Sequence, residues 1–292
     1  MSCRVLSANR LKEKFWPLIK SRQTFLLTLT GIAGYLCQRP VPMDWPRLTG
    51  LVGSMLFTIG GCTVLNMVFD RDIDCKMTRT NRRPMAAGQV NVGAASTLGG
   101  GLVALGLLWS LKLSLLYFIL ALAGVGLDVL VYTLWLKRRT AWSIFWGGLS
   151  GGIPILAGCS LVTGRVEPGG LLLAFAVVCW IPSHNLTLSI LYSDDYLNAG
   201  LPTFLNVYGL ATALAVMALS SLLTVTLMAA AFGWLHLSLA FLAISGTSGL
   251  GLVGLALYIW RRSARQTVRV LYKFSSFYIL AAMLLLMIGT LP

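Results

Sequence analysis

Long apolar stretches, separated by short polar segments, constrain this chain more than any other feature of its sequence. A helix needs about 20 apolar residues to cross the hydrocarbon core of a bilayer. Nine stretches of about this size occur, at 17–37, 46–69, 93–111, 113–136, 142–162, 169–192, 206–232, 237–260 and 271–290. Because 57% of the 292 residues are hydrophobic and only 11% are charged, the chain has more apolar surface than a soluble domain can bury.

We therefore expect an all-α fold: one integral-membrane domain over residues 1–292, built as a polytopic bundle of about nine transmembrane helices. Lys112 alone separates the third stretch from the fourth, so eight helices are the alternative count. The lipid bilayer is the first partner that the sequence predicts.

The basic residues predict how the bundle is oriented. Lys and Arg accumulate in the cytoplasmic segments of membrane proteins, and here most of them lie in the N-terminal segment, which includes Arg4, Arg10, Lys12 and Lys14, and in the loops after the second, fourth and eighth stretches. The loop after the sixth stretch lies on the same side by the alternation of the spans. We expect the N-terminus and these loops to be cytoplasmic, in the plasma membrane of a prokaryote. The net charge of +14 then reflects topology, and nucleic acid is not an expected partner because its binding needs a basic stripe on a soluble fold.

Five of the nine acidic residues gather in two short segments, Asp70, Asp72 and Asp74 after the second stretch and Asp194 and Asp195 after the sixth. Carboxylates so close to a membrane are costly and often functional. A single one could simply balance a neighbouring arginine, but two clusters on the same predicted side of the membrane indicate a site.

The first cluster has the spacing of a metal-binding helix face. Asn66, Asp70 and Asp74 follow one another at four-residue intervals, which stacks their side chains on one side of a helix. Mg²⁺ is usually held by one or two carboxylates and by phosphate oxygens of a substrate. We expect Asn66, Asp70, Asp74, Asp194 and Asp195 to bind Mg²⁺, with the four aspartates as the catalytic residues and Asn198, one turn beyond Asp194, as a further contact to a diphosphate.

These residues belong to motifs with a known counterpart. The stretch NMVFDRDID, followed by RTNRRPMAAG, resembles the first aspartate motif of the UbiA superfamily of intramembrane prenyltransferases, N-x-x-x-D-x-x-x-D with its R-T-x-x-R-P-x-x-x-G continuation. The resemblance runs from about Lys20 to Pro202. It implies helices around a central cavity, an active site near the cytoplasmic surface and a lateral opening to lipid.

The resemblance also implies a reaction. A polyprenyl group would pass from an isoprenoid diphosphate donor to a hydrophobic acceptor, with Mg²⁺ as the cofactor. The acceptor in this superfamily is heme, an aromatic quinone precursor or a prenylglyceryl phosphate, and these alternatives stay open here.

Four stretches resemble the protoheme IX farnesyltransferase branch of the superfamily: KSRQTFLLTLT, YTLWLKRRTAWSIFWGGLSGGIPILAG, the spacing from Trp180 to His184, and DDYLNAGLP. Three positions depart from that pattern. Asn185 and Leu186 stand where the branch has aromatic residues, and Thr203 stands where it usually has Met. The generic second motif, D-x-x-x-D, is also absent as such.

Four further residues are candidates for binding substrate. Arg22, Arg79 and Lys137 lie in the resembling stretches and would contact the diphosphate, although Arg22 and Lys137 could equally be membrane anchors. His184 has three open roles: a structural hydrogen bond, ligation of heme iron, or positioning of another acceptor. Asp128 is the one acidic residue inside an apolar stretch, and we expect it to pair with Lys137, Arg138 or a polar group of the cavity.

The alternative class is a transporter or cation channel that conducts ions along intramembrane acids. Such proteins place their acids near the middle of the membrane and often have broken helices, whereas this chain has its acids at one face beside arginines. A non-catalytic scaffold would leave both acidic clusters without a role.

Overall fold

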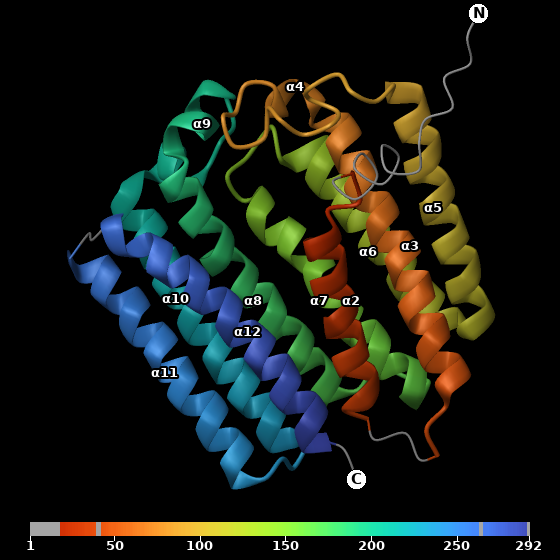
Figure 1. Cartoon of the computed structure of the whole chain (residues 1–292). Helices are drawn as coiled ribbons and strands as arrows, with labels where there is room; N and C mark the ends of the chain where they lie inside the picture. Colours follow the sequence, from red (N-terminus) through yellow and green to blue (C-terminus); the bar gives the residue numbers. More distant parts are fainter. Residues whose placement is uncertain (1–17, 39–41, 263–264, 291–292) are drawn as a thin grey trace, which may run out of the picture.

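The computed structural model describes residues 18–38, 42–262 and 265–290, and these residues form a bundle of helices (Figure 1). The helices are α2 (Ser21–Leu36), α3 (Trp45–Phe69), α4 (Arg71–Asp74), α5 (Val92–Leu113), α6 (Leu115–Val125), α7 (Ser143–Thr163), α8 (Pro168–Leu191), α9 (Ser193–Asn198), α10 (Phe204–Trp234), α11 (Leu239–Arg262) and α12 (Val268–Thr290). A π-helix, η1 (Gly126–Leu136), continues α6, and a short 3₁₀ turn, η2 (Arg265–Thr267), precedes α12. The predicted all-α bundle is confirmed; Arg4, Arg10, Lys12 and Lys14 lie outside the described residues.

Each predicted apolar stretch coincides with a helix. Within the described ranges, eight helices are long and apolar enough to cross a membrane, and α6 with η1 counts as one of them. The remaining stretch is α2, which has 16 residues and packs against α3, α7 and α12 inside the bundle. The third and fourth stretches, between which only Lys112 lies, form separate helices, α5 and α6 with η1. The count of eight therefore arises from the shortness of α2 and not from a fusion of these two stretches.

Polar residues at the ends of the apolar stretches determine where the helices begin. Asp44 accepts a hydrogen bond from the backbone N–H of Arg47 at 2.9 Å, Asn91 from that of Ala94 at 3.2 Å, and Thr203 from that of Asn206 at 3.2 Å. Each side chain satisfies one of the backbone donors that the first turn of a helix leaves unpaired.

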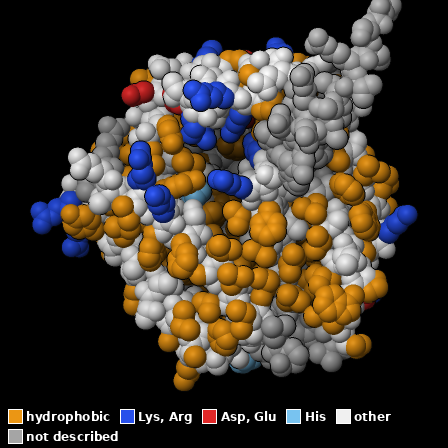
Figure 2. Space-filling view, viewed as in Figure 1, with side chains coloured by type: hydrophobic (Ala, Val, Ile, Leu, Met, Phe, Trp, Pro, Cys, Tyr) orange, Lys and Arg blue, Asp and Glu red, His pale blue; other side chains and the backbone are white. Residues whose placement is uncertain are grey.

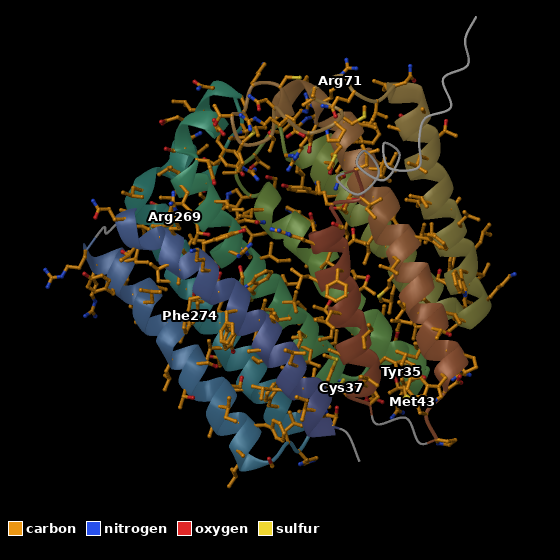
Figure 3. The ribbon with its side chains drawn as sticks, viewed as in Figure 1. Tyr35, Cys37, Met43, Arg71, Arg269 and Phe274 are labelled. Carbon is orange, nitrogen blue, oxygen red and sulfur yellow. The ribbon has the colours of Figure 1, made fainter. Side chains whose placement is uncertain are left out.

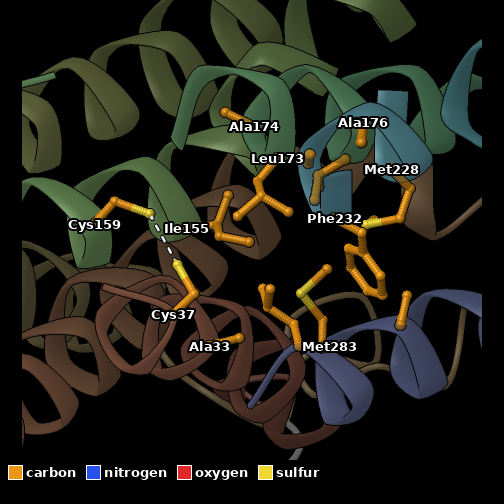
Figure 4. Packing of buried hydrophobic residues seen from close by; sticks show 14 of the residues in the cluster. Ala33, Cys37, Ile155, Cys159, Leu173, Ala174, Ala176, Met228, Phe232 and Met283 are labelled. Carbon is orange, nitrogen blue, oxygen red and sulfur yellow. Dashed lines mark hydrogen bonds between the residues drawn. The ribbon is translucent and has the colours of Figure 1, made fainter. Parts of the chain in front are cut away.

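Small residues allow α2 to lie directly against α7. A Cβ atom at Gly34 would come within 2.1 Å of the backbone oxygen of Ile155, and one at Gly158 within 2.1 Å of that of Gly31. Close backbone approach of this kind is a main source of helix association in membranes. Buried side chains such as Phe232 and Met283 continue this contact into α10 and α12 (Figure 4).

The π-helix changes the direction in which one span presents its side chains. Its i to i+5 pattern appears where the backbone N–H of Lys137 donates to the oxygen of Tyr132 at 2.9 Å. Such segments are rare and frequently occur at functional sites. Here η1 turns Asp128, Thr133 and Lys137 toward α3, at the end of the bundle where α4 and α9 lie (Figure 1).

Candidate active site

A cavity of about 670 Å³ opens at the α4–α9 end of the bundle and extends between the helices. Its polar end is lined by charged and amide side chains: Lys20, Arg22, Asn66, Asp70, Asp74, Arg79, Arg83, Asp128 and Lys137. Farther in, the lining is mostly apolar and includes Leu27, Met55, Ile59, Ala157 and Met283. This volume lies in the range of small-molecule binding pockets, and its two ends suit an amphiphilic ligand with an anionic head.

Basic side chains surround the cavity on the face between α2 and α12. Figure 2 shows this face hollowed, with Lys and Arg side chains around the hollow. Arg71 and Arg269 lie toward this end of the bundle, whereas Tyr35, Cys37 and Met43 lie at the opposite end (Figure 3). The positive charge predicted for one side of the membrane is thus concentrated at the mouth of the cavity.

Asp70 forms an ion pair with Lys137 at the polar end. The Lys137 Nζ lies 2.5 Å from Asp70 Oδ2, and the Asp70 side chain is only 5% exposed. The second oxygen, Oδ1, is buried and has no hydrogen-bond partner among the described residues. An orphaned buried carboxylate oxygen is costly, so this atom is available to a bound cation.

Asp74 has a comparable arrangement one turn farther along the chain. Arg83 Nη1 donates to both carboxylate oxygens, at 2.9 and 2.8 Å, and Asp74 is buried. Asp70 and Asp74, the two acids of the predicted metal-binding helix face, therefore both line the cavity, and each is paired with a cation there.

Asn66, the third residue of the predicted metal-binding helix face, is hydrogen-bonded to two side chains of the π-helix. Its Nδ2 donates to Asp128 Oδ2 at 2.9 Å, and its Oδ1 accepts from the Thr133 hydroxyl at 2.8 Å. The partner expected for Asp128 is thus a polar group of the cavity rather than Lys137 or Arg138. Together these bonds fix the orientation of the Asn66 amide beside Asp70.

The second acidic cluster lies at the same end of the bundle as the first. Asp195 is buried and accepts hydrogen bonds from Thr78 N, Thr78 Oγ1 and Arg79 N at 2.7–3.0 Å. Although burial acts in the opposite direction, these hydrogen bonds lower the pKa of Asp195 below its ordinary value. Asp195 therefore joins α9 to the loop that follows the first aspartate motif.

Asp194 and Asn198 are exposed on α9. Within the part of the chain that the structure describes, neither they nor Asp195 line the cavity. The structure thus brings the two clusters to the same end, as predicted, but it does not bring the second cluster into contact with Asp70 or Asp74. Metal binding by Asp194 and Asp195 stays a prediction.

The remaining predicted residues separate into cavity and surface positions. Arg22 and Arg79 line the cavity mouth, and the Arg79 guanidinium lies 5.4 Å from the centre of the Tyr192 ring. Asp72 points outward and is paired with Arg138 at 2.7 Å. Two residues along a helix correspond to a rotation of about 200°, so Asp72 faces away from the side that carries Asp70 and Asp74. Hydrogen bonds from Arg138 lower the pKa of Asp72.

His184 lines the cavity away from the carboxylates. Its imidazole is stacked between the rings of Trp180 and Tyr272, with both centre-to-centre distances at 4.6 Å. Tyr272 comes from α12, which the family resemblance did not cover, so this contact could not be predicted from the sequence.

Two further cations, Lys20 and Arg83, belong to the site but were not among the substrate-binding residues predicted from the sequence. Lys20 lies at the start of α2 and lines the cavity beside Asp70 and Asp128. Burial, with the charges of Arg83 and Lys137, lowers the pKa of Lys20 to about 8. Arg83 was one of several arginines in its loop. A signal existed for both, since Lys20 and Arg83 lie in the stretches that carry the family resemblance.

The sequence matches a family model and many curated proteins. The model of the UbiA prenyltransferase family matches residues 27–285. A protoheme IX farnesyltransferase of Korarchaeum cryptofilum is 35% identical over 89% of this chain and 87% of that protein. One from Archaeoglobus fulgidus is 33% identical over 90% and 94% of the two chains.

Solved structures share the fold. A digeranylgeranylglyceryl phosphate synthase superposes with a TM-score of 0.78 at 19% identity, covering 95% of this chain and 98% of that one. A UbiA homologue of Archaeoglobus fulgidus, bound to DMAPP and Mg²⁺, superposes with a TM-score of 0.70 at 16% identity, covering 94% and 99%. At these identities the likeness is one of architecture.

Proposed function

Because this chain belongs to the UbiA prenyltransferase family, we propose that it transfers a farnesyl-length prenyl group from its diphosphate to a porphyrin of the protoheme type. The family membership itself makes the chain an integral-membrane prenyltransferase, which uses an isoprenoid diphosphate and a hydrophobic acceptor. One observation carries the proposal: a single cavity joins a charged end to an apolar interior. The names of the curated relatives support protoheme as the acceptor.

The carboxylates at the polar end fit Mg²⁺. Among the described residues, no three His, Cys, Asp or Glu side chains group as a complete metal site, so a metal at Asp70 and Asp74 would need phosphate oxygens of the donor as further ligands. We propose that Asp70 and Asp74, with the Asn66 amide, hold it, and that Asp70 Oδ1 is a ligand. Asp194 and Asp195 would join them only by turning toward the cavity. Bound Mg²⁺ would neutralise the diphosphate as a leaving group.

The cations of the chain would bind the diphosphate oxygens. Lys20, Lys137 and Arg83 lie beside the acids, and Arg22 and Arg79 lie at the mouth. The allylic C–O bond breaks, its electron pair leaves with pyrophosphate, and the apolar walls keep water from the allylic cation. The cation is then attacked by a vinyl group of the acceptor, and water adds to the resulting carbocation with loss of a proton.

Product analysis tests this function directly. Purified protein would receive labelled farnesyl diphosphate, Mg²⁺ and one of three acceptors: protoheme, an aromatic quinone precursor or geranylgeranylglyceryl phosphate. We expect a prenylated and hydrated porphyrin by mass spectrometry, released together with pyrophosphate, and no product once EDTA has removed Mg²⁺. Prenylation of either other acceptor, with protoheme unchanged, would contradict the assignment of the acceptor.

We propose further that the mouth of the cavity faces the cytoplasm of a prokaryotic cell. Cys75 offers a natural probe, because it is exposed beside the aspartate motif while Cys37, Cys62 and Cys159 are buried. In a Cys3→Ser variant, which removes the cysteine of the N-terminal segment, a membrane-impermeant maleimide should label inside-out vesicles strongly and intact spheroplasts weakly. A Cys3→Ser/Cys75→Ser variant is the control. Equal labelling of spheroplasts would reverse the orientation.

A further inference from the structure

His184 is held on three sides by other side chains. Trp180 and Tyr272 cover the two faces of its ring, with interplanar angles of 24° and 26°. On the third side, Nδ1 lies 3.3 Å from Ser275 Oγ and 3.4 Å from Ser276 Oγ. His184 lines the cavity, and because both ring faces and Nδ1 have neighbours, we infer that the edge with Nε2 is the one that faces it.

The hydrogen bonds of the two serines favour one position for the proton of the imidazole. Ser275 Oγ donates to the Tyr272 carbonyl at 3.0 Å, and Ser276 Oγ donates to the same oxygen at 2.9 Å. Each hydroxyl has a single proton, and the shorter distances to the carbonyl favour donation there, an arrangement in which both serines accept from His184 Nδ1. A neutral imidazole with its proton on Nδ1 has its lone pair on Nε2.

An imidazole prepared in this way is a typical metal ligand. Histidines that bind metals generally donate their other ring N–H to an oxygen, which fixes the tautomer and the ring orientation. A further hydrogen bond joins the stacked rings of α8 to α12, because Trp180 Nε1 donates to the Ser275 carbonyl at 2.9 Å. A histidine that only joined α8 to α12 would need the Nδ1 contact but not a cavity-facing Nε2.

The same face of α12 carries two cations. Arg269, Lys273 and Ser276 follow at helical spacing and share a face. Ser276 lines the cavity, Arg269 and Lys273 are exposed, and Arg269 lies in the part of α12 nearer the α4–α9 end (Figure 3). They lie one to two turns before Ser276 and therefore nearer the polar end. Carboxylates on the edge of a bound ring system would meet them there.

We propose that His184 Nε2 is the axial ligand to the iron of the porphyrin acceptor, and that Arg269 and Lys273 bind its propionates. This assignment rests on the proposed function and adds the way in which the acceptor is held. Iron coordination would fix the position of the macrocycle along α8, and the propionate contacts would fix its rotation about the bond from iron to Nε2. Together they decide which vinyl group faces the donor.

Heme titrations test the coordination. Wild-type protein with ferric protoheme should show the shifted Soret band and the low-spin spectrum of an imidazole complex. In His184→Ala and His184→Gln, that spectrum should be lost and the affinity for heme should fall at least about tenfold, since even outer-shell changes at metal sites cost 10–100-fold. The affinity for metal-free protoporphyrin IX should not change. His236→Asn, at the only other histidine, is the matched control.

The propionate contacts have their own probe. An Arg269→Gln/Lys273→Gln variant should lose affinity for protoheme but not for its dimethyl ester. A variant at His184 that keeps the imidazole spectrum would overturn the coordination, even where protoheme is still prenylated. If instead no porphyrin binds the wild-type protein and another acceptor is prenylated, the proposed function fails as well. Circular dichroism of each variant separates these outcomes from misfolding.

Discussion

Asp70→Asn should lower kcat for prenyl transfer on the order of a thousandfold. The substitution removes a charged ligand from the proposed metal site, and metal stabilisation of a leaving group is worth several kcal/mol, at about 1.4 kcal/mol per tenfold in rate. Asparagine keeps an oxygen for Lys137 Nζ, so the buried ammonium retains a partner and the fold should survive. Asp70→Ala would leave that ammonium unpaired, which is strongly destabilising. Pyrophosphate release under saturating donor measures the effect.

Asp72→Asn is the matched control for this variant. Asp72 lies two residues away in the same motif, but its side chain is 60% exposed and its partner Arg138 is on the surface. Exposed ion pairs of this kind contribute little, so near wild-type turnover is expected. An Asp70→Asn enzyme that kept near wild-type rates at saturating Mg²⁺ would contradict the proposed metal site.

Lys137→Met should lower kcat on the order of a hundredfold. Lys137 lies at the end of η1 and its ammonium reaches the carboxylates at the polar end of the cavity. We expect it to stabilise the charge that develops on the departing diphosphate, and loss of one such group typically costs 10²–10³ in rate. Methionine preserves the length and the apolar stem but removes the charge. Single-turnover kinetics with labelled farnesyl diphosphate would measure this step.

Two comparisons make the Lys137 result specific. Arg138→Met changes the next residue, which is paired with Asp72 at the surface, and should leave turnover nearly unchanged. The Mg²⁺ concentration needed for half-maximal rate should not rise in Lys137→Met, because Asp70 loses its competing cation. A large rise would mean that Lys137 supports the metal site rather than the leaving group.

The fold was predictable because each helix is apolar over its own length. A span in a bilayer needs a continuous apolar stretch, so the sequence reveals the helices one by one, and the predicted ranges agree with the observed ones to within a few residues. The type of helix was not predictable. The π-helix at Gly126–Leu136 has the composition of an ordinary span, and its extra residue per turn leaves no mark in the hydropathy.

The site was predictable where its residues follow one another at helical spacing, here across the junction of α3 and α4 at Asp70. Asn66, Asp70 and Asp74 needed only helical spacing, and all three line the cavity. The partners of these residues come from elsewhere in the chain: Lys137 and Asp128 from the π-helix and its end, and Arg83 from the loop. Because Asp194 and Asp195 are adjacent in the sequence, a shared role was predicted for them. In the structure Asp195 accepts hydrogen bonds from Thr78 in the loop, whereas Asp194 is exposed. Tertiary packing decides such differences.

We expect the two ion pairs of the site, Asp70 with Lys137 and Asp74 with Arg83, to couple the binding of donor and metal thermodynamically, because both carboxylates are buried. Diphosphate alone would draw the cations away and leave two buried carboxylates without counter-charge, and a divalent cation alone would displace the ammonium and guanidinium in the same way. When both arrive, every charge has a partner. Each ligand therefore raises the affinity for the other, and the factor is equal in both directions because coupling free energies are reciprocal. We therefore expect the protein to take up the metal–diphosphate complex as a single ligand.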